Sequence, residues 1–154
     1  MTYGIIFWGN SVYSIHLFRL QKKIVRKITN SKKRNSCRNL YKNINIFTFI
    51  SQYIFSLLSC VVTNREQYIT NSHTQGRNTR YSSDIHQTIS NLSLKQRGSY
   101  HMGPKVFNSL PTYKRTYPVM FRNSNIFLKK FFIQILFICW RNIFNIIMHS
   151  ILYS

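Results

Sequence analysis

The chain has 154 residues, of which 22 are Lys or Arg and only two are acidic, so its formal net charge is +20. Apolar residues make up 44% of the sequence, enough for one ordinary domain with a core. Such an excess of positive charge attracts polyanions, so nucleic acid is the first partner to consider and an anionic membrane the second. Asn, Ile, Lys, Phe and Tyr are abundant, and AT-rich codons specify all five. Translation of AT-rich DNA, without selection for binding, is therefore an alternative origin of the positive charge.

The two acidic residues, Glu66 and Asp84, exclude most catalytic classes. Two-metal nucleotidyl transfer needs several converging carboxylates, which two acids in a polar segment do not supply. Ser82, Ser83 and His86 lie near Asp84, but we interpret them as loop residues and not as a hydrolytic triad. We therefore expect no enzymatic activity from the chain alone, no cofactor, no metal site and no small-molecule substrate.

The three cysteines are odd in number and widely spaced, at Cys37, Cys60 and Cys139. This spacing predicts neither a disulfide framework nor a zinc site with paired ligands. A reducing, intracellular compartment, nuclear or cytoplasmic, is the corresponding expectation.

In chain order, a short apolar run at residues 3–9 precedes the strongest predicted helix, which extends from Val12 to about Ile28 with Ser11 as its N-cap. One face of this helix is apolar and carries Leu17, Leu20, Ile24 and Ile28. A second face is a basic stripe, formed by Arg19, Lys22, Lys23, Arg26 and Lys27. The run of cations continues through Lys32, Lys33, Arg34, Arg38 and Lys42. No acidic residue occurs among the first 65 residues, whereas a solvated helix face normally carries charges of both signs. The basic stripe therefore suggests contact with phosphate, and an ordinary solvated face is the alternative.

Two further helices are predicted before residue 63, one capped by Ser36 and one capped by Ser51 that extends from Gln52 to Val62 and forms part of the core. Residues 63–98 are polar without apolar periodicity, so we expect an irregular and poorly ordered arm. A short ordered element follows at 104–111, bracketed by two prolines. The predicted fold class is mostly α, with a small loosely packed helical unit (1–62), the polar arm (63–98), a short ordered element and turn (99–122) and an apolar C-terminal helix (123–154).

The C-terminal helix contains a 23-residue apolar stretch at 131–153 that is long enough to cross a bilayer. Arg141 lies near its middle and opposes insertion, so a spanning helix and a buried helix remain alternatives. A small basic protein anchored in a membrane by this stretch is accordingly one alternative function.

Aromatic residues make up 16% of the sequence and lie partly among the basic segments. Aromatic rings beside cations can stack on nucleic-acid bases, but rings at helical spacing more often fill a core. We favour the core for this set, which comprises Tyr3, Phe7, Trp8, Tyr41, Tyr53 and Phe55.

Several segments, in the same order along the chain, together resemble one family. They are YGIIFWG at 3–9, FRLQKKIVRKI at 18–28, SCRNLYKNINI at 36–46, SQYIFSLL at 51–58, ITNSHTQGRNTR at 69–80 and GSYHMGPKVFNSLP at 98–111. This series is similar to the region after the catalytic palm in reverse transcriptases of jockey-like non-LTR retrotransposons. The similarity covers roughly residues 3–133.

The resemblance implies an RNA-directed DNA polymerase whose catalytic carboxylates lie in the palm, and this chain has no such carboxylate box. It also implies that residues 1–62 are thumb-like and hold RNA or DNA by its backbone. The implied phosphate contacts are Arg19, Lys22, Lys23, Arg26 and Lys27, with Arg77 and Arg80 as further candidates. We therefore expect a non-catalytic fragment or degenerate copy that binds nucleic acid non-specifically; a C-terminal piece of a complete polymerase with an upstream palm is the alternative.

Overall fold

The computed structural model describes residues 4–76 and 79–110, which form a mostly helical unit, so the predicted fold class is confirmed for this part of the chain. The elements are α1 (Ile5–Trp8), α2 (Ser14–Ile28), α3 (Cys37–Ile44), α4 (Phe49–Thr63), the 3-10 helix η1 (Arg65–Gln67), α5 (Asn71–Gln75), α6 (Ser93–Arg97) and α7 (Ser99–Asn108). The predicted C-terminal helix at 123–154, with the apolar stretch at 131–153, lies outside the described residues.

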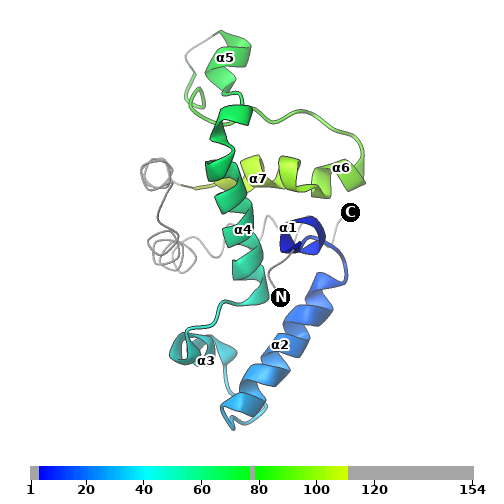
Figure 1. Ribbon diagram of the computed structural model, residues 1–154, viewed down its shortest axis with the longest axis vertical. Helices are drawn as coiled ribbons and strands as arrows, with labels where there is room; N and C mark the ends of the chain where they lie inside the picture. The colour runs from blue at the N-terminus through cyan, green and yellow to red at the C-terminus, as the bar shows by residue number, and fades with distance from the viewer. Residues whose placement is uncertain (1–3, 77–78, 111–154) are drawn as a thin grey trace.

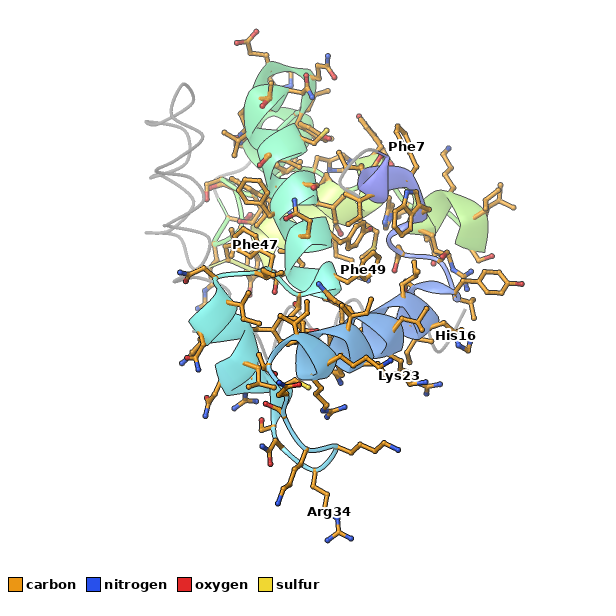
Figure 2. All side chains as sticks on the ribbon, turned by 60° about the horizontal axis from the view of Figure 1, so that its bottom comes forward. Phe7, His16, Lys23, Arg34, Phe47 and Phe49 are labelled. Carbon is orange, nitrogen blue, oxygen red and sulfur yellow. The ribbon has the colours of Figure 1, made fainter. Side chains whose placement is uncertain are left out.

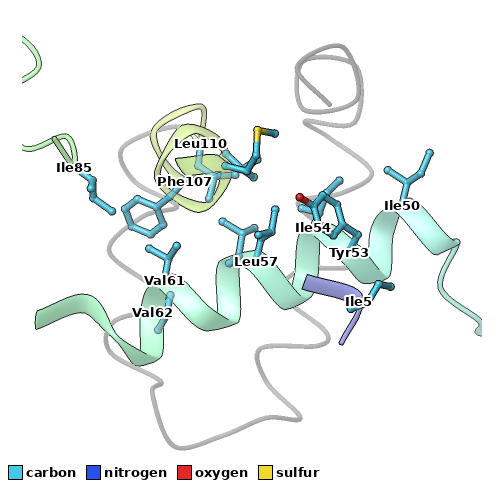
Figure 3. Close-up of a cluster of buried hydrophobic side chains, with 13 residues drawn as sticks. Ile5, Ile50, Tyr53, Ile54, Leu57, Val61, Val62, Ile85, Phe107 and Leu110 are labelled. Carbon is cyan, nitrogen blue, oxygen red and sulfur yellow. The ribbon is translucent and has the colours of Figure 1, made fainter. Parts of the chain in front are cut away.

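Helix α4 forms the centre of the unit, with α5 at one end of the long axis and α2 and α3 towards the other (Figure 1). Eight of its 15 residues are buried, because apolar side chains occupy nearly every turn. Figure 3 shows the apolar side chains of α4 against Ile5 of α1, Ile85 of the loop between α5 and α6, and Phe107 of α7. The prediction that this helix is core is therefore confirmed.

Helices α4 and α7 approach each other closely at Gly103. A Cβ atom added there would lie 2.7 Å from Cγ2 of Val61, nearer than real Cβ contacts. A residue without a side chain therefore sets the distance between the two helices.

The prediction of a short element bracketed by Pro104 and Pro111 was wrong at its start. Helix α7 begins at Ser99 and contains Pro104 in its interior. Pro104 is buried beside Met102. Packing of these side chains outweighs the one backbone hydrogen bond that a proline cannot donate.

Among the predicted helix caps, Ser36 is confirmed, since its hydroxyl accepts a hydrogen bond from the backbone N–H of Arg38 at 3.4 Å. The prediction that Ser11 caps α2 was wrong, because α2 begins at Ser14. Tyr13 precedes the helix and makes no side-chain cap hydrogen bond. The backbone N–H of Ser14 donates to the carbonyl of Ser11 at 3.0 Å, so a turn already occupies the position expected for the cap.

Ser51 was also wrong as a cap, because α4 begins at Phe49. The hydroxyl of Thr48 accepts from the backbone N–H of Ser51 at 3.2 Å and is the true N-cap. Ser51 is buried one turn further along. Thr48 and Ser51 are both good capping residues, and tertiary contacts select between them, since Ile50 packs in the core and Gln21 accepts from the backbone N–H of Phe49.

Residues 63–98 hold more structure than the sequence predicts, since η1, α5 and α6 lie within them. An isolated antiparallel bridge joins Thr70 to Ile85, and Ile85 is 1% exposed. The side chain of Asn108 accepts from the backbone N–H of Ile85 at 3.0 Å and donates to its carbonyl at 2.8 Å. The buried side chain of Ile85 and the amide of Asn108 thus anchor this segment on α7. A single buried residue gives no apolar periodicity in the sequence, so this anchor could not be predicted.

Candidate nucleic-acid interface

Helix α2 carries the predicted basic stripe, and a narrow face of the helix attaches it to the rest of the unit. This packing face consists of Ser14, Phe18, Gln21 and Val25, of which Ser14 and Val25 are buried. Val25 lies in a small cluster with Cys37 and Tyr41 of α3. Burial of Tyr41 raises the pKa of its phenol to about 12.

Gln21 fixes α2 to the connection between α3 and α4. Its Nε2 donates to the carbonyl of Phe47 at 2.9 Å, and its Oε1 accepts from the backbone N–H of Phe49 at 2.7 Å. The second bond satisfies one of the free N–H groups at the start of α4. The role of Gln21 could not be predicted from the sequence, since a glutamine on a helix gives no signal of its tertiary partner.

Three cations of the predicted stripe, Arg19, Lys23 and Lys27, are exposed to solvent. They lie at i, i+4 and i+8, so they form one row along α2. Figure 2 shows Lys23 on the outer side of the helix. A row of this kind, without acidic residues on the helix, suits contacts to successive phosphates of a nucleic-acid backbone.

The other two predicted contacts, Lys22 and Arg26, are half-buried and have partners within the protein. The Nζ of Lys22 lies 4.1 Å from the centroid of the Phe18 ring, a cation–π contact. The Nη2 of Arg26 donates to the carbonyl of Asn35 at 3.4 Å, and its Nε is buried without a hydrogen-bond partner among the described residues. The exposed row is therefore narrower than the five-residue stripe predicted from spacing.

The turn between α2 and α3 extends the basic surface. Lys32, Lys33 and Arg34 are all exposed there, and Arg34 lies at the tip of the turn in Figure 2. Arg38 and Lys42 on α3 are exposed as well. The predicted continuation of the basic run therefore exists on the surface of the folded unit, next to the end of α2.

The two further candidates do not join this surface. Arg77 lies outside the described residues. Arg80 is exposed, but the loop that carries it packs on α5, where the amide of Asn71 donates to the carbonyl of Tyr81 at 3.1 Å. Helix α5 lies at the opposite end of the unit from the α2–α3 turn (Figure 1).

Of the aromatic residues for which we favoured the core, Tyr41 and Tyr53 are buried. Trp8 stacks on Phe49 with 5.4 Å between ring centroids, but it is 37% exposed and so lies at the surface and not in the core. Phe7, in contrast, is 83% exposed, so the core prediction was wrong for this residue. Phe55 is half-buried, and Tyr3 lies outside the described residues.

An open hollow of about 510 Å³ is lined by Asn71, Asp84, His86 and Lys105 among others. The Nδ1 of His86 lies 3.2 Å from the side-chain oxygen of Asn71, so an amide orients the ring. Ser82 and Ser83 are not among the lining residues. The hollow thus brings Asp84 and His86 to one surface but does not add the neighbouring serines.

Within residues 4–76 and 79–110, no three His, Cys, Asp or Glu side chains lie close enough to share a metal ion. In the same residues no single helix has the length and apolar character of a membrane span; α3 and α4 meet that description only as a pair bent by 57°. No protein-family model matches the chain, and no curated protein or solved structure matches it either.

Proposed function

We propose that the chain is a non-catalytic piece or degenerate copy of a retrotransposon reverse transcriptase that binds RNA or DNA backbone without sequence preference. The family origin is supported by the colinear resemblance described above. The binding is supported by a single observation, the row of Arg19, Lys23 and Lys27 along α2, continued by the cationic α2–α3 turn.

The physical basis of this binding is the release of counterions from nucleic acid. Each phosphate that a cation neutralises lowers the slope of log affinity against log salt by about 0.7 for single strands and about 0.9 for B-form DNA. Three contacts from α2 alone therefore predict a slope of about −2 to −3, and the turn makes it steeper. Contacts to the backbone carry no sequence information, so scrambled oligonucleotides bind with equal affinity.

The direct test is the salt dependence of oligonucleotide binding by two double variants of the full chain. Lys23→Gln/Lys27→Gln should make the slope shallower by about 1.4–1.8, because two phosphate contacts are lost. Arg80→Gln/Lys95→Gln is the matched control, since it removes two exposed cations from other elements, one in the loop that packs on α5 and one on α6. An equal change of slope in both variants would contradict an interface on α2.

A primer-extension assay tests the proposal that the chain has no polymerase activity of its own. The isolated chain should not extend an annealed primer in the presence of Mg²⁺, because Glu66 and Asp84 are its only carboxylate side chains. Magnesium-dependent extension by the pure protein would overturn it. An uninterrupted palm-coding frame immediately upstream in the genome would instead favour the alternative of a complete polymerase.

A further inference from the structure

The apolar face predicted for α2 is not the face that packs on the unit. Leu17 is 37% exposed, Leu20 52%, Ile24 55% and Ile28 64%. Tyr13, one turn before Leu17, is 77% exposed and falls on the same side. The packing face described above lies beside this row, so α2 presents a continuous apolar row to solvent over its whole length.

Cations border this apolar row along one side. Lys23 follows Leu20 by three positions and Lys27 follows Ile24 by three, which places each lysine next to an apolar neighbour on the helix surface. Both lysines are exposed. A helix with an exposed apolar face, bordering cations and no acid is suited to the boundary between lipid headgroups and acyl chains.

We infer that this face of α2 binds an anionic lipid surface, with the helix parallel to the membrane plane. The apolar row enters the boundary between headgroups and acyl chains, while Lys23 and Lys27 contact lipid phosphates. Charge selects this occupant over a second copy of the helix, because α2 has no acidic residue to face Lys23 and Lys27, whereas an anionic lipid surface supplies phosphates to both. Binding of nucleic-acid backbone would leave the same five apolar side chains in water. The proposed function therefore does not account for the apolar row.

The test measures flotation of the full chain with vesicles of phosphatidylcholine, with or without phosphatidylserine. The wild-type chain should float with the mixed vesicles and far less with the neutral ones. Leu20→Gln/Ile24→Gln keeps every charge and replaces half-exposed side chains, and it should lower partitioning by at least about tenfold. Equal binding to both kinds of vesicle would overturn the inference.

The matched control is Leu92→Gln/Leu94→Gln, which replaces two apolar residues that are 69% and 85% exposed at α6. Its partitioning should equal that of the wild-type chain. Residues 131–153 are unchanged in all three proteins, so binding through that stretch would give equal flotation of the two variants, and that result would overturn the inference. Oligonucleotide binding by Leu20→Gln/Ile24→Gln should stay at the wild-type level, which separates this test from that of the proposed function.

Discussion

Helices α2 and α4 each have 15 residues, but the structure uses them in opposite ways. Eight residues of α4 are buried and its neighbours pack around it, whereas α2 buries only Ser14 and Val25. The remaining surface of α2 divides into a cationic row and an apolar row, and both face solvent. Stability of the unit therefore depends on α4, while the surface available to partners lies on α2.

Truncating the same side chain on the two helices should give the largest difference. Leu57→Ala on α4 should lower the free energy of unfolding by about 2–5 kcal/mol, because Leu57 is 1% exposed and its loss leaves a cavity. Leu20→Ala on α2 should change it by no more than about 0.5 kcal/mol. Urea denaturation of both variants measures the two values, and similar losses would show that the apolar row of α2 is covered.

Removing the attachment of α2 should have an intermediate effect. Gln21→Ala should lower the free energy of unfolding by about 1–3 kcal/mol, since it leaves the carbonyl of Phe47 and the N–H of Phe49 without these bonds in a half-buried place. Gln96→Ala is the control, because its Nε2 donates an exposed, local hydrogen bond to the carbonyl of Ser90. If the two variants unfold at the same urea concentration, Gln21 does not hold α2 in place.

The smallest effect is expected for Tyr41→Phe at neutral pH. The phenol oxygen is buried without a hydrogen-bond partner among the described residues, so its removal should change stability by less than about 1 kcal/mol. Because burial raises the pKa of Tyr41 to about 12, the neutral phenol stabilises the fold below about pH 10, and this stability is lost between about pH 10 and pH 12.

The variant should therefore lose less stability than the wild-type chain when urea denaturation is repeated at pH 10.5. All other titratable groups are common to both proteins and cancel in the comparison. A parallel loss in the two proteins would show that the Tyr41 phenol is not held neutral by the fold.

Helix types and approximate limits could be predicted from the sequence because they depend on local periodicity. The positions of α2, α3 and α4 follow from apolar spacing and nearby capping residues. The choice between Thr48 and Ser51 as cap, and the start of α7 before Pro104, depend on tertiary packing and could not be read locally.

The candidate site also has a part that follows from helical spacing and a part that depends on tertiary contacts. Spacing correctly placed Arg19, Lys23 and Lys27 in one row, because helical geometry alone determines which residues are neighbours. It could not show that Lys22 and Arg26 have partners inside the protein, since those contacts depend on Phe18 and on the path of the next turn. Nor could it show that Val25, and not the longer apolar row, faces α3.

Lysine footprinting of the unmodified full chain shows directly whether nucleic acid binds at α2. An amine-reactive reagent labels every exposed lysine, and mass spectrometry compares each site with and without saturating single-stranded RNA. Labelling of Lys23 and Lys27 should fall on RNA binding, while labelling of Lys95, exposed on α6, should stay constant. Constant labelling of Lys23 and Lys27, or an equal fall at Lys95, would contradict an interface on α2.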